Sequence, residues 1–572
     1  MSSPPSIADV HAELTAPAQP FEMEDVVIRG ISTRTWKHCP PSLRSILEIS
    51  RGHGDVDFLV YEDERLRYDE HFRTSAHLAN VLRDEVGVRK GDRIAIAMRN
   101  YPEWSLAFWA ATALGAIAVP LNAWWTGQEL TYGMTDSVST VLFCDDERLD
   151  RLADELPGIK TLQAVIVVRD PRSEPPNGAR HFADVLGEVP ADVELPAEAI
   201  DPEDDATIFY TSGTTGFPKG VLGTHRNITT NLMSLGFGAA RAARRAPAPV
   251  EGAAPSTPSG RNVHLLSVPF FHATGCHSVL VANVAAGNTV VLMHKWDAGR
   301  ALELIERERV TNFGGVPAMV WQVIEHPDFE KRDRSSLRGV GYGGAPAAPE
   351  LVRKIEELFP GRAPTNGYGL TETSSVTTLN SGIDYQRHPD SVGVPVPVCD
   401  VKVVGPDGET LATGEVGELW IKGPNVVKGY FGKPEATAET FSDGWLHSGD
   451  LGRIDDEGFV YIMDRAKDLL IRGGENISSV EVESALFEHE AVTDAAVIGI
   501  PHPVLGEEVG AVVHLAPGSS VTEDALKAHV ADRLAGFKVP VRIWFYDDPL
   551  PRNPAGKIMK RELRNQLLEP KR

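Results

Sequence analysis

The sequence predicts an α/β protein with a large N-terminal region of several sub-domains and a small α+β domain at the C-terminal end. The first observation is length, because 572 residues exceed one ordinary domain. The second is an alternation of strand-like and helix-like segments from about residue 41, which predicts crossover connections and largely parallel sheets. The third is a change after Val392 to short strand-like segments separated by turns, which predicts a small antiparallel sub-domain.

The individual elements are predicted from the spacing of apolar residues. Helical spacing predicts helices over residues 66–81, 104–114 and 298–309. Short apolar runs predict strands over residues 93–98, 118–121, 140–144, 263–268 and 288–293. Strands over residues 401–404 and 417–421 are expected in the small sub-domain. Near the C-terminus, residues 522–535 are expected to form a helix that Thr522 caps and Gly536 ends.

The chain is expected to divide into three parts. Residues 1–40 form an arm or a mobile tail, residues 41–463 the large N-terminal domain, and residues 464–572 the C-terminal domain. Within the N-terminal domain, residues 241–261 are rich in Ala, Pro and Arg and are interpreted as a low-complexity surface insertion. Its three leading arginines are expected in a solvated loop; contact with a ligand phosphate or a lipid headgroup is the alternative.

Composition narrows the class of protein. The formal net charge of −24 argues against nucleic acid or an anionic membrane as a partner. Four scattered cysteines predict neither a disulfide framework nor a zinc site, and they fit a reducing compartment such as the cytoplasm. No signal peptide is expected, because the N-terminus lacks a basic segment followed by an apolar core. The longest apolar run, residues 106–125, predicts a buried helix and a strand and no integral membrane segment, because glycine, proline and asparagine interrupt it.

A loop rich in glycine and threonine follows the strand-like segment at residues 206–210. Its glycines allow backbone N–H groups to turn inward, its hydroxyls add donors and its lysine adds a positive charge, which together predict a cradle for phosphate groups. A solvated turn is the alternative. The motif differs from the P-loop, in which the lysine directly follows the last glycine. The candidate phosphate-binding residues are Thr211, Ser212, Gly213, Thr214, Thr215, Gly216 and Lys219.

Later motifs carry side chains suited to a nucleotide. In the segment Asn366–Thr373, the ring of Tyr368 offers a face for stacking, Glu372 is a hard oxygen ligand suited to Mg²⁺, and Thr371 could donate to an α-phosphate. Further along, the Asp450 carboxylate could accept hydrogen bonds from both ribose hydroxyls. Each motif taken singly could be an ordinary turn. The small residues and the ring expected around the adenine are Gly344, Ala345, Pro346, Gly367, Tyr368 and Gly369.

Taken together and in this order, the motifs resemble those of the adenylate-forming superfamily, which includes acyl- and aryl-CoA synthetases, luciferase and peptide-synthetase adenylation domains. The resemblance extends from Thr211 to Lys557. It implies that His272, which alone would be an ordinary loop histidine, lines the acyl pocket as a wall or gate and not as a base. It implies that Arg465 is a second ribose contact. It also implies that Lys557 bridges the substrate carboxylate and the α-phosphate in the first half-reaction.

The resemblance further implies a hinge at residues 464–468. Lys467 would be its pivot, and Gly473 and Gly474 would approach the pantetheine after the terminal domain turns. A charged linker between domains is the plainer interpretation of the same residues.

The implied activity is that of an ATP-dependent acid–CoA ligase that uses Mg²⁺. It would form an acyl-AMP with release of pyrophosphate and then pass the acyl group to the thiol of coenzyme A. The sequence as a whole most resembles bacterial medium- and long-chain fatty acid ligases. Aromatic acids are the second candidate substrates, and ring or sterol-derived acids the third. Transfer to an amine or a carrier protein, and a non-catalytic paralogue that only binds nucleotide and acyl group, are the alternatives. A homodimer is the default expectation for such an enzyme.

Overall fold

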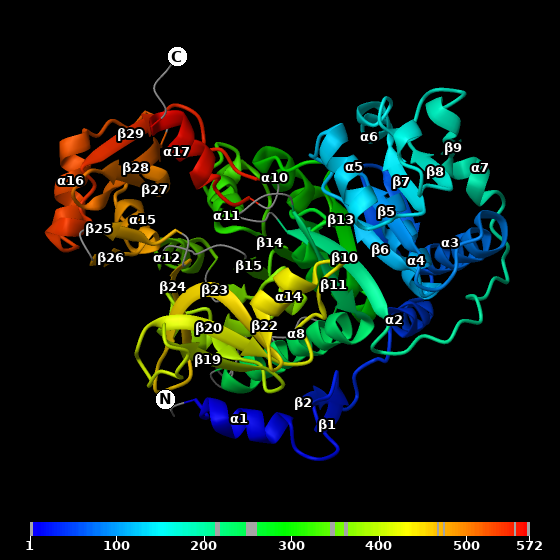
Figure 1. The fold of residues 1–572 in the computed structure, drawn as a ribbon, viewed down its shortest axis with the longest axis horizontal. Coiled ribbons are helices and arrows are strands. Elements are labelled where there is room, and N and C mark those ends of the chain that lie inside the picture. Colours follow the sequence, from blue (N-terminus) through cyan, green and yellow to red (C-terminus); the bar gives the residue numbers. More distant parts are fainter. Residues whose placement is uncertain are drawn as a thin grey trace.

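Two large mixed sheets, a small antiparallel sheet and a separate terminal domain make up the protein (Figure 1). The structure is a computed structural model. It describes residues 4–211, 218–246, 260–343, 349–359, 364–465, 468–472, 475–516, 518–553 and 556–568. The α/β fold class predicted from the sequence is confirmed, with a large N-terminal region and a small C-terminal domain.

The first sheet has eight strands in the order β21-β11-β10-β6-β5-β7-β8-β9. The strands from β10 to β9 are parallel, and β11 and β21 add antiparallel to one edge. Its strands are β5 (Arg93–Ala97), β6 (Ile117–Pro120), β7 (Val141–Asp145), β8 (Ala164–Val168), β9 (Arg180–His181), β10 (Asp205–Thr211), β11 (Lys219–Thr224) and β21 (Gly429–Tyr430).

The second sheet has nine strands in the order β18-β17-β16-β15-β14-β12-β13-β3-β4. It is parallel from β16 to β3 and antiparallel at both edges. Its strands are β3 (Asp57–Tyr61), β4 (Glu64–Arg67), β12 (Val263–Leu266), β13 (Thr289–Leu292), β14 (Asn312–Gly315), β15 (Gly339–Gly343), β16 (Thr365–Tyr368), β17 (Thr378–Ser381) and β18 (Val394–Pro395).

Helices fill the space between the two sheets and cover their outer faces. One hydrophobic core joins apolar residues of β5 and β7 to residues of β3 and β12 through helices α2, α3 and α4. Helix α4 is buried all round, which suits a helix between two sheets. Helices α5 and α6 cover the other face of the first sheet, and α10 to α12 cover the other face of the second. The helices of this region are α2 (Leu43–Ser50), α3 (Tyr68–Val81), α4 (Pro102–Ala113), α5 (Gly127–Asp136), α6 (Asp146–Arg151), α7 (Phe182–Leu186), α8 (His225–Arg245), α9 (Ala282–Ala286), α10 (Ala298–Arg307), α11 (Pro317–Ile324), α12 (Pro349–Leu358) and α13 (Ile383–Arg387).

The small sheet and the terminal domain follow in sequence. The small sheet pairs its strands antiparallel and carries helix α14 (Pro434–Thr440) beside it. The terminal domain has its own apolar core, between its sheet and helices α15 (Ser479–Phe487) and α16 (Glu523–Ala531), and it ends in α17 (Lys560–Leu568). The strands of the small sheet are β19 (Asp400–Val404), β20 (Gly417–Lys422), β22 (Phe441–Ser442), β23 (Trp445–Ile454) and β24 (Val460–Arg465). The strands of the terminal domain are β25 (Leu470–Arg472), β26 (Glu475–Ile477), β27 (Val492–His502), β28 (Gly506–Leu515) and β29 (Arg542–Tyr546).

The N-terminal arm packs against the large domain. It forms α1 (Ile7–Leu14) and a hairpin of β1 (Met23–Ile28) and β2 (Ile31–Trp36). The rings of Phe21, Trp36 and Phe237 contact one another, which ties the hairpin to helix α8. The guanidinium of Arg29 donates to the carbonyls of Val426 and Val427 at 2.9 and 2.7 Å.

Two expectations from the sequence are wrong in detail. The helix expected from residue 66 begins at Tyr68, because residues 64–67 form the edge strand β4. The surface insertion expected over residues 241–261 begins later, because α8 continues to Arg245. Arg241 and Arg245 are 1% and 3% exposed, and Arg245 pairs with Asp384 at 2.6 Å. The Ala- and Arg-rich composition hid a helix in which Arg241 and Arg245 are buried and Arg244 is exposed. Residues 247–259 lie outside the described ranges.

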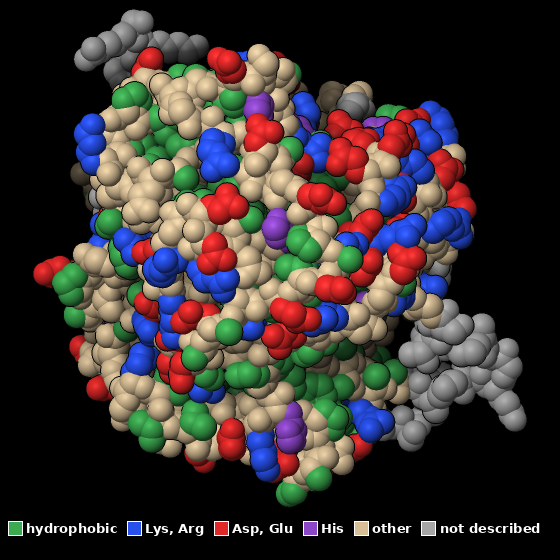
Figure 2. Space-filling view, turned by 90° about the vertical axis from the view of Figure 1, so that its right-hand side faces the viewer, with side chains coloured by type: hydrophobic (Ala, Val, Ile, Leu, Met, Phe, Trp, Pro, Cys, Tyr) green, Lys and Arg blue, Asp and Glu red, His purple; other side chains and the backbone are tan. Residues whose placement is uncertain are grey.

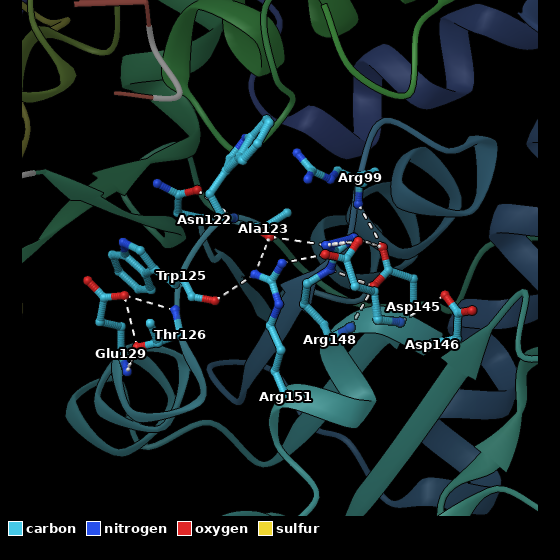
Figure 3. A network of polar contacts seen from close by, with 12 residues as sticks. Arg99, Asn122, Ala123, Trp125, Thr126, Glu129, Asp145, Asp146, Arg148 and Arg151 are labelled. Atoms are coloured by element: carbon cyan, nitrogen blue, oxygen red, sulfur yellow. Dashed lines mark hydrogen bonds and ion pairs between the residues drawn. The ribbon is translucent and has the colours of Figure 1, made fainter. Parts of the chain in front are cut away.

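A buried polar network fixes the loops at the carboxyl ends of β5, β6 and β7 (Figure 3). The side chains of Asp145 and Arg148, both fully buried, form two contacts of 2.6 Å. Asp145 also accepts from the backbone N–H groups of Arg99 and Arg148 at 3.1 and 3.0 Å, and the side chains of Arg148 and Arg151 both donate to the carbonyl of Ala123. A buried ion pair needs further hydrogen bonds to offset its desolvation, and this pair has them. The network therefore holds three loops in one arrangement beside β10.

The surface carries charges of both signs. On the face in Figure 2, acidic and basic side chains are interspersed and do not gather into a patch of one sign. Across the described ranges, no helix combines the length and the apolar character that crossing a membrane requires. The apolar run at residues 106–125 is α4 followed by β6, as the sequence predicted.

Candidate active site

The predicted phosphate loop begins and ends on paired strands. Thr211, the last residue of β10, is the register partner of Lys219, the first residue of β11. Tyr132 of α5 donates to the carbonyl of Pro218 at 2.9 Å and so fixes the end of the loop. The loop residues predicted to hold phosphate, Ser212, Gly213, Thr214, Thr215 and Gly216, lie outside the described ranges. The structure thus places both ends of the predicted cradle at one edge of the first sheet.

Glu372 and Lys219 both contact Tyr430. The Tyr430 hydroxyl donates to Glu372 Oε1 at 2.9 Å, and Lys219 Nζ lies 4.7 Å from the centre of the Tyr430 ring. Glu372 and Thr371 belong to a short 3₁₀ turn, and the Glu372 carbonyl accepts from the N–H of Val427 at 3.0 Å. The predicted metal ligand therefore bonds the hydroxyl of Tyr430, and the predicted phosphate-binding lysine lies over the ring of the same residue.

The backbone around Glu372 is strained. Ser374 and Ser375 have φ angles of +55° and +103°, which L-residues rarely adopt. Gly369 is required here, because a Cβ on it would lie 1.4 Å from the Ser375 carbonyl oxygen. Ser374 is held by His277, whose Nδ1 lies 3.2 Å from its carbonyl oxygen. Such strain persists where the surroundings fix it, and it occurs often at functional sites.

The predicted ribose and adenine motifs meet at Tyr368. Its hydroxyl donates to Asp450 Oδ2 at 2.8 Å, and the Arg465 guanidinium lies 3.1 Å from Asp450 Oδ1. Burial, followed by the Asp450 carboxylate, raises the pKa of Tyr368 well above its usual value, so the phenol stays protonated and donates. Gly367 pairs with Gly343 across β16 and β15, which places the two pieces of the adenine motif side by side. Gly344, Ala345 and Pro346 lie outside the described ranges.

His272 lies in a buried segment between β12 and a π-helix, Thr274–Val281. Its Nε2 is buried and has no hydrogen-bond partner among the described residues. Burial, with a smaller contribution from the charge of Lys557, lowers the pKa of His272 to about 4. An imidazole with this pKa is neutral at pH 7 and a weak base; its expected role as a wall stays a prediction. π-Helical turns occur frequently at functional sites.

Lys557 reaches this segment from the terminal domain. Gly556 has a φ of +78°, and a Cβ on it would lie 2.4 Å from Val316 Cγ2, in the turn between β14 and α11. Lys557 lies near enough to His272 for its charge to add to the effect of burial in lowering the pKa of that histidine. Within its own domain, the N–H of Lys557 donates to Asn553 Oδ1 at 2.9 Å. The structure therefore brings the C-terminal lysine to the acyl side of the candidate site.

The junction between the domains is held by Asp464. Its carboxylate accepts from the backbone N–H of Arg465 at 2.7 Å and from the N–H of Ser479 at 2.5 Å. Ser479 begins helix α15, so the contact spans the predicted hinge. Lys467, Gly473 and Gly474 lie outside the described ranges.

Two contributors to the site were missed from the sequence. Tyr430 belongs to no motif that was singled out, although an aromatic residue beside a glycine at a strand edge was a weak signal. His277 lies on the π-helix, five residues after His272. Its second ring nitrogen, Nε2, has no partner among the described residues. Asn231, Ser278 and Ser375 form a second polar group beside it, with Ser278 and Ser375 oxygens 2.8 Å apart.

Comparison with known proteins agrees with this geometry. The sequence model of the AMP-binding enzyme family matches residues 48–431, and that of the AMP-binding enzyme C-terminal domain matches residues 481–557. A feruloyl-CoA synthase from an Amycolatopsis species is 38% identical over 502 residues, covering 88% of this chain and 94% of that protein. A long-chain-fatty-acid–CoA ligase from Bacillus subtilis is 34% identical over 555 residues, covering 92% and 95%.

A solved structure shows the same architecture. It is the crystal structure of an anthranilate CoA ligase in complex with anthranoyl-AMP, with a TM-score of 0.81 and 26% sequence identity, covering 92% of this chain and 97% of that one. Both family domains, the shared architecture and the relatives' full-length coverage agree. The chain belongs to the AMP-binding enzyme family of adenylate-forming enzymes and is an acid–thiol ligase.

Proposed function

We propose that the protein joins an aromatic carboxylic acid to coenzyme A at the expense of ATP. The observation that carries the proposal is the approach of the Lys557 loop to Val316 and His272 of the large domain. The π-helix that follows His272 contacts the turn that holds Glu372, through His277 and the Ser374 carbonyl. One site then contains a group for each part of an acyl-adenylate. Residues 464–572 would form the mobile terminal domain, with the hinge at 464–468.

In the first half-reaction, a carboxylate oxygen of the acid attacks the α-phosphorus of ATP and the bond to the pyrophosphate oxygen breaks. Lys219 and the 211–217 loop would hold the leaving phosphates, and Asp450 with Arg465 would hold the ribose. Thr371 would donate to the α-phosphate. Lys557 would lie beside the reacting carboxylate and neutralise the charge that develops at phosphorus.

Glu372 fits the role of a magnesium ligand. Mg²⁺ commonly binds through one or two carboxylates together with substrate phosphates and water. Among the described residues no cluster of three His, Cys, Asp or Glu side chains could hold a metal by itself, so a nucleotide-dependent site suits the donor set. When bound, Mg²⁺ would neutralise phosphate charge. Glu372 is fixed through both its carbonyl and its Oε1, which orients its carboxylate before any ligand arrives.

In the second half-reaction, the sulfur of coenzyme A attacks the acyl carbon, the bond to AMP breaks and the thiol proton leaves. Rotation of the terminal domain about Lys467 would withdraw Lys557 and bring Gly473 and Gly474 to the site. His272 would remain as a neutral wall beside the entering thiol. A hinge of this kind lets one site serve two reactions.

The choice of acid rests on the relatives and on the wall next to His272. The sequence placed fatty acids first and aromatic acids second; a feruloyl-CoA synthase and an anthranilate CoA ligase among the similar proteins support the reverse order. His277 Nε2 on the π-helix is buried without a partner among the described residues, and it suits an acid that carries a hydroxyl or amino group better than a plain hydrocarbon tail, because an unpaired buried polar group is costly. A medium- or long-chain fatty acid is the second candidate, supported by the Bacillus ligase.

A panel of acids tests both the acid and the acceptor. Pyrophosphate release would be measured with ferulate, 4-coumarate, anthranilate, dodecanoate and hexadecanoate, and the products formed with coenzyme A or with an amine would be weighed by mass spectrometry. We expect hydroxylated aromatic acids to give the highest kcat/KM and the CoA thioester as product. Turnover confined to the fatty acids, or an amide as the product, would overturn the proposal. The cytoplasmic location and the homodimer expected from the sequence stay predictions.

A further inference from the structure

Tyr430 stands between two oppositely charged groups of the candidate site. Its hydroxyl donates to Glu372 Oε1 at 2.9 Å, and Lys219 Nζ lies over its ring at 4.7 Å from the centre. The ion pairs among the described residues include none between Lys219 and Glu372. Opposite charges that share one neighbouring side chain attract each other in a partly desolvated site, so a group that keeps them from pairing would leave both for a ligand.

The position of Tyr430 is set by backbone contacts. Strand β21 pairs with β11, with Tyr430 opposite Val221, and the N–H of Phe431 donates to the Gly220 carbonyl at 2.8 Å. Two residues before β21, the N–H of Val427 binds the Glu372 carbonyl. One short segment is thus tied both to the strand that starts with Lys219 and to the turn that carries Glu372. The Tyr430 N–H also donates to the Thr437 hydroxyl at 3.0 Å.

We propose that Tyr430 is a positioning residue for adenylation, which holds Glu372 and Lys219 apart and aimed at the triphosphate before ATP binds. The hydroxyl occupies one carboxylate oxygen and leaves the other toward the metal. The ring stabilises the lysine through a contact weak enough to be exchanged for a phosphate. The inference deepens the proposed function and rests on the role given there to Glu372.

The hydroxyl and the ring of Tyr430 contact different groups, Glu372 and Lys219. The hydrogen bond and the ring contact are separable by substitution. Tyr430→Phe removes the hydroxyl and keeps the ring, whereas Tyr430→Leu removes both.

The test measures metal binding as well as turnover. Mn²⁺ binding to the full chain would be followed by electron paramagnetic resonance in the presence of the non-reactive α,β-methylene analogue of ATP. Steady-state kinetics would give the KM for ATP and kcat. The matched control is Tyr461→Phe, because the Tyr461 hydroxyl also donates to a carboxylate, Asp455 Oδ2 at 3.0 Å, away from the site.

We expect Tyr430→Phe to weaken Mn²⁺ binding by about tenfold, because a hydrogen bond to a charged group is lost. We expect Tyr430→Leu to raise the KM for ATP by about a further threefold, because the ring contact to Lys219 is lost as well. The control variant should match the wild type in both measurements, and melting temperatures should show that all variants fold.

Glu372→Gln separates this inference from the proposed function. If Glu372→Gln binds Mn²⁺ as the wild type does, the metal role of Glu372 falls and the positioning role falls with it. If Glu372→Gln loses Mn²⁺ while Tyr430→Phe keeps wild-type binding, the metal role stands and Tyr430 is not a positioning residue. Equal effects of Tyr430→Phe and Tyr430→Leu on every readout would refute the separate role of the ring.

Discussion

The two sides of the candidate site are held in different ways. On the N-terminal side, Thr211 and Lys219 are strand partners, Glu372 is tied to Val427, and the buried Asp145–Arg148 pair fixes the neighbouring loops. On the other side, Lys557 is hydrogen-bonded within its own domain to Asn553, and the neighbouring Gly556 meets Val316 of the large domain. The difference suggests that nucleotide binding is built into the fold, whereas the reacting cation is delivered and can be withdrawn.

Removing the delivered cation should have the largest effect. Lys557→Ala is expected to slow pyrophosphate release by about 10²- to 10³-fold, since a charge that stabilises the transition state is lost. Thioester formation from supplied acyl-AMP should be unchanged, because Lys557 has left the site in that step. Rapid-quench assays of each half-reaction would check this.

The control for Lys557→Ala is Lys527→Ala, which removes a lysine of the same domain from a surface ion pair with Glu523. This variant should leave both half-reactions as they are. Equal loss of both half-reactions in Lys557→Ala would show that the lysine is not specific to adenylation, and the contrast between the two sides of the site would be lost.

The contact between Gly556 and Val316 can be changed without removing a charged side chain from either side of the site. Gly556→Ala is expected to slow adenylation by about tenfold, because a small displacement of a reacting group is costly. The added Cβ would lie 2.4 Å from Val316 Cγ2. Thioester formation should be spared, since it does not need this contact.

Val316→Ala would relieve the clash. The double variant Gly556→Ala, Val316→Ala should recover part of the adenylation rate, with a remaining cost of about 1 kcal/mol from the positive φ of residue 556. A double variant no faster than Gly556→Ala would mean that the clash with Val316 is not what limits the approach of Lys557.

Sequence alone could predict the groups that lie in short motifs. Lys219 and Glu372 were predicted as phosphate and metal ligands because the chemistry that suggests such roles is local in the sequence. Tyr430 and the Asp464–Ser479 contact were not found, because their partners are distant in the chain and no periodicity marks them. Arg29 belongs to the same class, since its contact with Val427 spans 398 residues.

The fold was predicted with similar limits. Alternating strands and helices gave the class and most elements, since apolar spacing reports burial. Composition misled at residues 241–245, where burial of Arg241 and Arg245 depends on Asp384 and Leu379 of a later segment. Each large sheet also contains strands that are distant in the sequence: β21 joins the first sheet, and β3 and β4 join the second. No local pattern predicts such pairing.

A change at the junction between the two domains should have a smaller effect on the two half-reactions. Ser479→Ala removes a hydroxyl that lies 3.2 Å from Asp464 Oδ1, across the predicted hinge. Weakening this contact should disfavour the domain arrangement proposed for adenylation and favour the one proposed for thioester formation. Adenylation should therefore slow and thioester formation should quicken, each by about threefold. Parallel single-turnover measurements of both steps would check the opposite signs. A fall in both would indicate a purely structural contact.

The smallest expected effect is that acid destabilises the large domain more than the terminal domain. His71, His225 and His277, all in the large domain, are at most 2% exposed, and each has one buried ring nitrogen without a partner among the described residues. Burial lowers the pKa of His71 to about 3, and it lowers the pKa values of His225 and His277 to about 4. Below the ordinary pKa of 6.5 the unfolded chain therefore binds protons that the folded chain does not.

It follows that the stability of the large domain should fall as the pH drops from about 6.5 towards 4. Each histidine should contribute about 1 kcal/mol of this loss by pH 5.5. His225→Gln keeps an acceptor for the Leu43 N–H and removes one titrating group, so it should flatten the dependence of the melting temperature on pH. His529→Gln, in the terminal domain, is the matched control, because that imidazole is only partly buried. Melting curves of the large domain that fall equally steeply in both variants would show that burial of His225 does not set its acid sensitivity.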